Sequence, residues 1–598
     1  MRRFATLGLF SLLATADLAA TSVHIQEVGL NGNYTSNTVP TRIRVTVTNS
    51  EPVAETIELR FRIHDQKRGF ERGGNRYTTR IMLGAGEERA VELPMLMVDA
   101  YEPVAEVEAR DASGRIVAHD AISVSRGRAG ILVAILCAEK PVCEEVEAAI
   151  AASRPPAQEG ENRAEPQFAF LLGPEEHWWA YCQAGAVVLA APTQKYSQSQ
   201  RTALEDYARM GGHVLLVMDR VADPTIFAGY GEATASGKEQ GVAKGSLTRT
   251  PTIRVPEFKA AAARLVAFGA ATTWQTNWRQ GANQGSEMSW MSEHFTTVFH
   301  FPGLGWLLSL LGLYVLTVGI VNFSILHRIG QREWGWVTVP ALALIFSVAI
   351  FAASTARRPK QVGEDEIAVY WMDDHSSVAA AEGRIRVSSP HGMKMQVRVP
   401  GEWIFTWGTE LWREGGPGLM LAAGAEERGW DIEFGPPWQT ELPFMQWSFR
   451  DLEFQTIKRF PGTVVRSSAT RLRNETGQEF QQAIYLDKEN AYFLGFLAKN
   501  AEVDFSAAQK SSVKSLSRPS FPFPRKAASE FEGIGNSKEL GSLLMTASWL
   551  PYVERNSETC SGVFFGLAEE NVLGAAVSAA PVTRQSHALT IVSFTPRP

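Results

Sequence analysis

Two long stretches without a charged residue constrain this chain more than any other feature. Residues 303–326 and 334–356 contain no Asp, Glu, Lys or Arg. A helix needs about 20 apolar residues to cross the roughly 30 Å hydrocarbon layer of a membrane. Buried helices of soluble proteins rarely run this long without a charge, so we disfavour that alternative. The sequence predicts two transmembrane helices, 303–326 and 334–356, joined by a link at 327–333.

The N-terminus predicts the side of the membrane on which the domains lie. It has two arginines, an apolar run over residues 4–13, and small residues around Ala19 and Ala20, as secretory leaders do. We therefore expect a signal peptide at 1–20. Export then places both large parts of the chain outside and the link 327–333 in the cytoplasm.

The cations that flank the predicted helices agree only in part with this orientation. Cytoplasmic segments usually carry the excess of Lys and Arg. The link holds Arg328 and Arg332, but Arg357, Arg358 and Lys360 follow the second helix at its other end. We give the leader more weight because long exported domains translocate largely regardless of charge.

A chain of 598 residues exceeds one hydrophobic core, so several domains are expected. In TIELRFRI the residues Ile57, Leu59 and Phe61 share one face of an alternating strand. A hairpin is expected around 111–114. Short strands at this spacing predict an immunoglobulin-like β-sandwich over 21–127.

The pattern changes in residues 128–300, which we predict to be a three-layer α/β domain of flavodoxin or amidotransferase type. Its continuous apolar runs are typical of strands buried on both faces, and they alternate with helices. The expected strands are 130–136, 168–172, 186–191 and 213–218, and the expected helices are 141–152 and one that begins near Ser197 and ends at Gly211 and Gly212.

Residues 360–598 return to alternating strand patterns, as in GRIRVSS and KMQVRVP. Two strands are expected on either side of a turn at 474–477, and one helix near 537–550. We predict a β-rich extracytoplasmic domain over 360–598. The fold class is then a multidomain α+β membrane protein.

The segment HWWAYCQAGAVVLAAPTQKYSQSQRTALEDYARMGGHVLLVM resembles the degenerate class I glutamine-amidotransferase-like domain of a group of uncharacterised bacterial membrane proteins. In that group a Trp-containing segment precedes a buried strand, a Ser-x-x-Gln helix start, a Gly-Gly pair and another buried strand. The residues that fit this pattern are Ser197, Gln200, Leu204, Gly211 and Gly212.

Two later segments extend the resemblance over much of the chain. VNFSILHRIGQREWGWVTVP is similar to the group's order of Asn, Leu-x-Arg-x-Gly-x-x-Glu-Trp and Pro, and LRNETGQEFQQAIYLDKENAYFLGFL is similar to its strand, turn, strand pattern. The resemblance implies a bacterial inner-membrane protein with extracytoplasmic domains. Some relatives work with membrane-associated ATPase or transport systems, which implies such a complex as a partner.

Residues for amidotransferase chemistry are missing from the expected places. Such a site needs a cysteine on a sharp turn after a strand. Residues 192–194 and 219–221 follow two of the predicted strands and contain no cysteine. Cys182 is close in sequence to His177, but we favour a packed segment without thiolate chemistry.

Phosphate, dinucleotide and metal sites are disfavoured as well. In the segment 229–240, five residues instead of four separate Gly231 from Gly237, and Lys238 is followed by an acid, so we interpret the segment as a loop. No G-x-G-x-x-G follows the first strand of the α/β domain. The acidic run 363–375 lacks EF-hand spacing, and we interpret it as a solvated strand edge. We expect no catalytic, cofactor-binding or metal-binding residues and no cofactor.

Charge and cysteine content exclude further classes. The net charge of −6 gives no electrostatic reason to expect nucleic acid. Cys137, Cys143, Cys182 and Cys560 lack the C-x-x-C spacing of zinc sites. A disulfide between Cys137 and Cys143 is compatible with export, but we favour four buried, unpaired cysteines.

Neither predicted helix has an ionisable residue in its middle, so two such helices make a poor channel. Gly312 and Gly319 lie near one face and offer a packing surface for a partner helix. We expect a membrane-anchored extracytoplasmic scaffold or binding protein without catalytic activity. Its partners are the lipid bilayer and a protein of the cell envelope or of an ATPase or transport complex, of which the chain is then an accessory subunit. The alternative is an amidase-like or carbohydrate-active hydrolase that uses the α/β domain.

Overall fold

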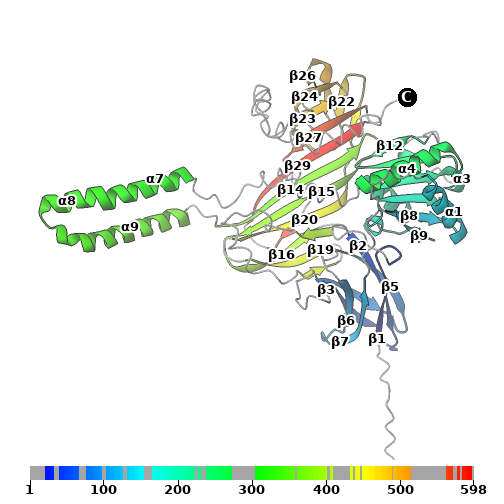
Figure 1. Cartoon of the computed structure of the whole chain (residues 1–598), viewed down its shortest axis with the longest axis horizontal. Coiled ribbons are helices and arrows are strands. Elements are labelled where there is room, and N and C mark those ends of the chain that lie inside the picture. The colour runs from blue at the N-terminus through cyan, green and yellow to red at the C-terminus, as the bar shows by residue number, and fades with distance from the viewer. Residues whose placement is uncertain are drawn as a thin grey trace, which may run out of the picture.

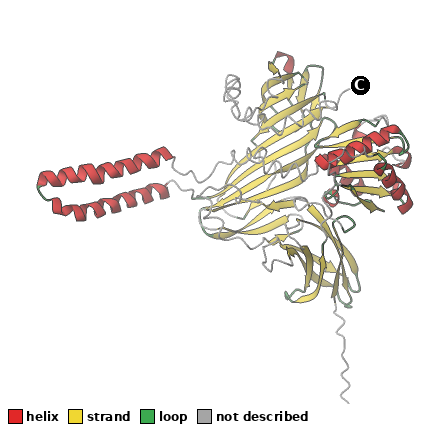
Figure 2. Cartoon of the chain, in the orientation of Figure 1, coloured by secondary structure: helices red, strands yellow, loops and turns green. Residues whose placement is uncertain are grey.

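The computed structural model describes residues 21–32, 40–65, 76–96, 103–124, 131–153, 165–221, 226–230, 237–271, 304–356, 360–399, 404–407, 431–434, 438–444, 448–487, 489–512, 561–569, 576–578 and 582–594. The predicted leader at 1–20, the predicted helix near 537–550 and Cys560 lie outside these residues. The chain is a mixed α/β multidomain protein rich in strands, with two apolar helices that stand apart from the body (Figures 1 and 2).

The N-terminal strands form two antiparallel groups. β1 (Thr21–Val28), β2 (Pro40–Asn49) and β5 (Glu88–Leu96) make one sheet. The second group is β4 (Arg76–Leu83), β3 (Glu55–Asp65), β6 (Pro103–Arg110) and β7 (Ile116–Ser123), in that spatial order. The hairpin expected at 111–114 joins β6 to β7, and Gly114 takes the left-handed conformation that the turn requires, with φ of +83°.

The second group continues into the part of the chain that follows the apolar helices. β18 (Asp431–Glu433) pairs in parallel with β4, so that Ile432 lies opposite Tyr77. β19 (Trp438–Phe444), β16 (Met393–Val399) and β28 (Ala576–Val577) extend the sheet to eight strands. The sheet predicted within 21–127 is therefore completed by residues more than 300 positions later.

Residues 131–271 form the α/β domain. Its six-stranded sheet has the order β12-β13-β11-β10-β8-β9, and only β12 runs antiparallel to its neighbour. The parallel strands follow the doubly wound order 2-1-3-4-5, with the switch point between β8 and β10. The strands are β8 (Leu132–Cys137), β9 (Gln167–Leu171), β10 (Ala186–Ala190), β11 (His213–Val217), β12 (Glu239–Val242) and β13 (Gly245–Thr250).

Helices cover both faces of this sheet. α1 (Lys140–Ala151) and α4 (Pro256–Ala271) pack on one face, while η1 (Trp178–Tyr181) and α2 (Gln198–Arg209) pack on the other. The shorter helices are η2 (Thr193–Lys195), α3 (Met218–Val221) and η3 (Ala228–Tyr230). α2 begins where predicted, because the Ser197 hydroxyl accepts from the Gln200 amide and the Gln200 side chain accepts from the Ser197 amide.

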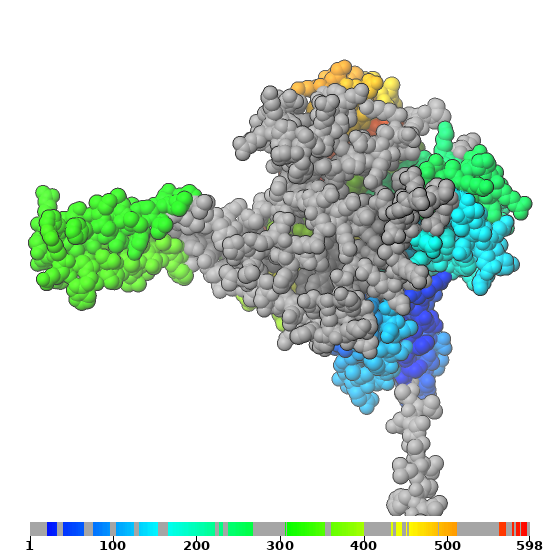
Figure 3. Space-filling model, in the orientation of Figure 1, coloured from blue at the N-terminus to red at the C-terminus, as the bar shows by residue number. Residues whose placement is uncertain are grey.

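The two apolar helices form an antiparallel hairpin, whose outer surface is exposed (Figure 3). The first apolar helix consists of α7 (Leu304–Val315), a π-helical segment η4 (Leu316–Val321) and α8 (Asn322–Ile329). η5 (Arg332–Trp334) leads into α9 (Gly335–Ala356), which contains Pro340. The first helix extends three residues beyond the predicted 326, because the left-handed Gly330, with φ of +78°, is the residue that ends it.

Nine strands after the hairpin form the largest sheet, here called sheet F. Its order is β17 (Ile404–Trp407), β20 (Ser448–Arg459), β15 (Val378–Ser389), β14 (Val362–Asp373), β29 (Val582–Phe594), β27 (Gly562–Ala568), β23 (Phe480–Leu486), β24 (Asn490–Leu497) and β26 (Gln509–Ser512). A small sheet of β21 (Val464–Arg466), β22 (Arg471–Asn474) and β25 (Glu502–Asp504) lies beside it, with η7 (Phe505–Ala507).

Sheet F is buried on both faces because a different partner covers each. Along β14 the odd-numbered residues from Ile367 to Trp371 join the core that contains α2 and η1 of the α/β domain. The even-numbered residues from Ala368 to Met372 join the core shared with the eight-stranded sheet and the N-terminal strands. Residues before and after the hairpin thus pack into two common hydrophobic cores.

Candidate functional site

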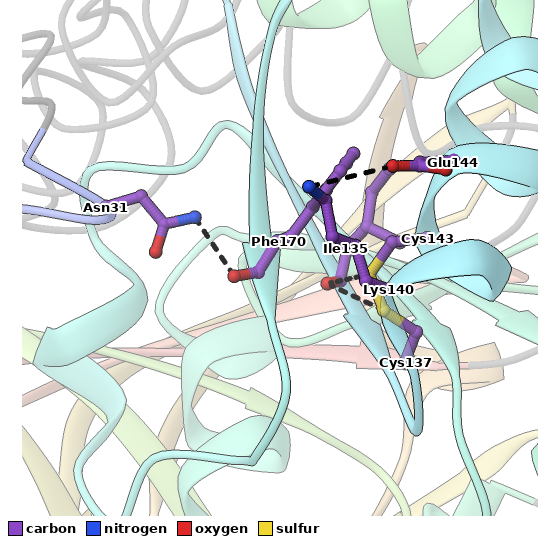
Figure 4. The surroundings of a disulfide bond; sticks show 7 residues. All are labelled: Asn31, Ile135, Cys137, Lys140, Cys143, Glu144 and Phe170. Atoms are coloured by element: carbon purple, nitrogen blue, oxygen red, sulfur yellow. Dashed lines mark hydrogen bonds and ion pairs between the residues drawn. A yellow bond between two sulfur atoms is a disulfide. The ribbon is translucent and has the colours of Figure 1, made fainter.

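The carboxyl edge of the parallel sheet is the first place to look for a site. Doubly wound sheets bind ligands in the crevice at the switch point, here beyond β8 and β10. A disulfide between Cys137, the last residue of β8, and Cys143 on α1 lies at this edge (Figure 4). Their Cα atoms are 5.6 Å apart, and both side chains are buried. Our preference for unpaired cysteines at these two positions is wrong, because helix α1 turns Cys143 back onto the strand end.

The other strand ends at this edge carry structural contacts. After β10, Thr193 is buried, and the Arg201 guanidinium donates to its carbonyl oxygen over 3.3 Å. After β11, the Asp219 amide donates to the Pro251 carbonyl, and Arg220 forms an ion pair with Glu145 at 3.0 Å. The residues 192–194 and 219–221 therefore hold the turns to the helices rather than a nucleophile.

Cys182 lies inside the α/β core and not at an accessible surface. Its thiol donates weakly to the Trp178 carbonyl, and complete burial raises the pKa of the thiol well above its usual value. The His177 ring stacks on Trp179, with ring centroids 4.8 Å apart. Because a nucleophilic cysteine needs a lowered pKa, this geometry favours the packed segment that we expected.

A buried polar cluster fastens the α/β domain to sheet F. The Tyr230 hydroxyl donates to Asp373 Oδ2 over 2.7 Å, and Arg209 hydrogen-bonds the same hydroxyl. Arg209 also donates to Asp206 over 2.6 Å. Burial raises the pKa of Asp373 above its ordinary value, and the bond from Tyr230 opposes this shift only in part. We name Asp206, Arg209, Tyr230 and Asp373 the interdomain polar cluster.

A second contact crosses the same interface. Lys244, on the turn between β12 and β13, donates to Glu382 Oε1 over 2.6 Å. The Trp371 indole donates to the same oxygen over 3.1 Å, and the Lys244 ammonium lies 5.7 Å from the centre of the Trp371 ring. Both polar contacts thus join side chains on opposite sides of one apolar interface.

The N-terminal strands contact the α/β domain through a third group of charges. Arg42 on β2, almost completely buried, forms ion pairs with Glu27 and Glu175. Arg44 pairs with Glu175 as well, at 3.1 Å. The Gln183 amide donates to the Thr41 hydroxyl over 2.8 Å. The N-terminal strands, the α/β domain and sheet F are therefore connected by paired polar groups.

The acidic run at 363–375 is not a solvated edge, and that prediction is wrong. β14 is the fourth of nine strands, and Glu364, Asp365 and Glu366 are only 2%, 5% and 2% exposed. Arg584 on β29 donates to Glu364 over 3.0 Å, and Arg386 lies directly opposite Asp365 on β15. Cations on the neighbouring strands make a buried position possible for these acids.

The segment 229–240 ends at the start of a strand. In the segment interpreted as a loop, residues 231–236 lie outside the described residues, and β12 begins at Glu239. Asp373, Asp374 and His375 share the turn after β14, whereas Asp365 lies eight residues away along the strand. Within the described ranges, no three His, Cys, Asp or Glu side chains meet in a group that fits a metal ion.

Polar contacts inside the hairpin are few. The Asn322 amide donates to the Thr338 hydroxyl over 3.0 Å and joins the two helices, and Tyr314 packs edge-on against Phe346. A Cβ atom added at Gly312 or Gly319 would meet no atom within 4 Å, so these glycines are not needed for contact between the two helices.

Sequence reasoning missed the interdomain polar cluster. Tyr230 and Asp373 are 143 positions apart, and no local pattern links η3, α2 and the end of β14. The one available signal was a polar Asp373 that directly follows the apolar run IAVYWM.

No protein-family model and no curated protein matches the sequence. A beta-glucosidase from Kluyveromyces marxianus is 15% identical over 18% of this chain and 14% of its own, with a TM-score of 0.13. A beta-glucosidase from Listeria innocua is 14% identical over 18% and 16%, with a TM-score of 0.14. A CARDB domain from Pyrococcus furiosus, solved with di-metal ions, is 15% identical over 18% and 86%, with a TM-score of 0.13. The chain spans about a seventh of the glucosidases' length, and likenesses this weak carry no argument about function.

Proposed function

We propose that this chain is a membrane-anchored scaffold or binding protein without catalytic activity, with all its large domains on the extracytoplasmic side of a bacterial inner membrane. The proposal assigns it to an envelope or transport-associated complex. The sequence resemblance to amidotransferase-like bacterial membrane proteins supports this assignment.

One observation carries the proposal: the residues before and after the hairpin share two hydrophobic cores and one β-sheet. If both helices span the bilayer, parts of the chain that pack together lie on the same side of it. Only the tip of the hairpin then reaches the opposite side. The leader predicted at 1–20 makes the shared side the exported one.

The disulfide supports an oxidising compartment for the body. Disulfides persist in exported proteins and are rare in the cytosol. The bond also removes the two cysteines at the carboxyl edge of the α/β sheet from nucleophilic chemistry. Paired side chains at the other strand ends favour a structural role for the α/β domain.

A matched pair of single cysteines tests the topology. We would place Gln331→Cys at the tip and Gln361→Cys after α9, in a Cys560→Ser background, and treat intact spheroplasts with a membrane-impermeant maleimide. The proposal expects labelling at position 361 in intact cells and at 331 only after lysis. Labelling at 331 in intact cells contradicts it.

A second experiment tests the scaffold role. Solubilisation of membranes in a mild detergent, followed by affinity purification of the full chain, is expected to return a stoichiometric envelope, ATPase or permease subunit. Purification of the chain alone after cross-linking in intact cells contradicts the role in a complex.

A further inference from the structure

The tip of the hairpin carries two guanidinium groups. α8 ends at Ile329, Gly330 reverses the chain, and η5 begins at Arg332. This tight turn places Arg328 in the last helical turn of one apolar helix and Arg332 at the start of the next. Both arginines therefore lie at the same end of the hairpin.

Arg332 is held in place by a histidine. Its Nε and Nη2 atoms both donate to His327 Nδ1, at 3.0 and 2.5 Å. The His327 ring stacks on Phe323 with an interplanar angle of 13°. Because a guanidinium has five N–H donors, three remain available after these two bonds. A fixed guanidinium with free donors suits an oxyanion such as phosphate.

Glu333 follows Arg332 in η5, so the tip carries one acid beside its two arginines. Within the part of the chain that the structure describes, neither Arg328 nor Arg332 forms an ion pair with a carboxylate. Exposed arginines elsewhere in the body are commonly paired, as Arg89 is with Glu87 and Arg115 with Asp111. The two cations at the tip are thus left for a partner from outside the chain.

The apolar length of the hairpin sets the level of these cations in a bilayer. The two spans, Leu308–Ile329 and Arg332–Ala352, contain 22 and 21 residues. At about 1.5 Å per residue, each covers about 32 Å, close to the thickness of the hydrocarbon layer. Trp334 and Trp336 lie next to Arg332 and are 57% and 79% exposed, as residues of the headgroup region are.

We propose that Arg328 and Arg332 bind the phosphate of anionic phospholipids in the cytoplasmic leaflet. This inference rests on the proposed function, which places the tip at that leaflet. His327 acts as a positioning residue that orients Arg332 toward the headgroup. Bound anionic lipid would fix the depth and tilt of the hairpin relative to the body.

Native mass spectrometry of the full chain released from mixed phosphatidylglycerol and phosphatidylcholine nanodiscs tests the inference. The wild type is expected to retain phosphatidylglycerol preferentially. Each cation near an anionic surface contributes a factor of about five, so the double variant Arg328→Gln/Arg332→Gln is expected to lose the preference by more than about tenfold. Arg115→Gln, which removes an exposed charge on the body, is the control and is expected to leave it unchanged.

Three further measurements separate the outcomes. His327→Ala is expected to weaken the preference less than the loss of Arg332, because the charge stays but its orientation is lost. Inorganic phosphate added in detergent is expected not to bind, since the site needs the bilayer surface. Alkaline extraction tests whether the chain is integrated in the membrane. Release of the chain would contradict both the proposed membrane anchor and the lipid site. An integrated chain with no lipid preference, or with the same preference in the double variant, overturns this inference alone.

Discussion

The body and the hairpin of this protein place their apolar side chains in opposite ways. The body buries its apolar side chains and pairs buried polar groups with one another, as in the interdomain polar cluster. The hairpin exposes its apolar side chains, among them Leu311 and Phe351, and has few polar contacts between its helices, such as the bond from Asn322 to Thr338. The hairpin therefore has the exposed apolar surface that a membrane-spanning segment needs, whereas the body keeps its apolar surface away from water.

The largest effect is expected from a charge placed inside the body. Leu204 on α2 is fully buried between the α/β sheet and sheet F. Leu204→Asp leaves an unpaired carboxylate there and is expected to lower the free energy of unfolding by more than about 4 kcal/mol. Denaturant unfolding of the full chain in detergent measures this. Gln198→Asp, on the exposed first turn of the same helix, is the control, and an equal loss in both variants would contradict the assigned faces.

The same charge on the outer surface of the hairpin tests whether that surface faces lipid or water. Leu311 is 56% exposed, and Leu311→Asp would cost about 3 kcal/mol if that surface faces hydrocarbon. The integrated fraction after alkaline extraction is expected to fall. Val53→Asp, at a position 67% exposed on the body, is expected to change stability by less than about 0.5 kcal/mol. An unchanged integrated fraction for Leu311→Asp would show that this surface of the hairpin does not face hydrocarbon.

The pH dependence of the body tests the interdomain polar cluster. Because burial raises the folded-state pKa of Asp373, its contribution to stability is full below the unfolded pKa and is lost as pH rises through the folded pKa. Asp373→Asn keeps an acceptor for Tyr230 and removes this loss. Above the ordinary pKa of 3.8, the slope of unfolding free energy against pH is expected to become less negative by up to about 1.4 kcal/mol per pH unit.

An exposed aspartate provides the control for sign. The Ser506 hydroxyl lowers the pKa of Asp504, so the contribution of Asp504 is present above its unfolded pKa and lost as pH falls. Asp504→Asn is therefore expected to change the slope in the opposite direction. Unfolding midpoints measured from about pH 2 to 8 report both variants, because the effect of Asp504 falls below its ordinary pKa of 3.8 and that of Asp373 above its own. Parallel profiles for Asp373→Asn and the wild type would show that Asp373 does not titrate with folding.

A smaller effect is expected at the second interface contact. Lys244→Met leaves Glu382 with only the Trp371 donor and is expected to destabilise the chain by about 1–2 kcal/mol. Lys394→Met removes an exposed ion pair with Glu441 and is expected to cost less than about 0.5 kcal/mol. Equal effects in the two variants would argue that the α/β domain is not docked on sheet F in solution.

The smallest effect is expected within the hairpin. Asn322→Val removes the hydrogen bond to Thr338 and is expected to cost about 0.6 kcal/mol, the average for such bonds in membranes. A double-mutant cycle with Thr338→Val, followed by unfolding in mixed micelles, measures the coupling. Thr317→Val, whose hydroxyl bonds within its own helix, serves as the control. Zero coupling would show that the hydrogen bond between Asn322 and Thr338 does not stabilise the hairpin.

Local patterns predicted the elements well where a single periodicity was at work. The apolar run before α1, the helix start near Ser197 and the turn after Arg110 need only neighbouring residues, and the structure has all three. The uncharged stretches likewise predicted the two helices of the hairpin, with the first ending three residues early in the prediction.

Sequence reasoning failed where a residue's environment came from distant strands. Glu364 looks like a surface residue until Arg584, 220 positions later, is known to lie beside it. The pairing of β4 with β18 and the bond between Tyr230 and Asp373 are of the same kind. The disulfide was one of two open alternatives, because spacing alone did not fix whether α1 turns Cys143 back to β8.

The pairing of β4 with β18 also dictates an order of events during synthesis. β4 ends at Leu83 and β18 begins at Asp431, so the ribosome adds nearly 350 residues between them. At about 5–20 residues per second, β4 waits for about 17–70 s with an unpaired backbone edge. A premature stop anywhere in the hairpin leaves that edge unpaired for good, and such a fragment is expected to aggregate.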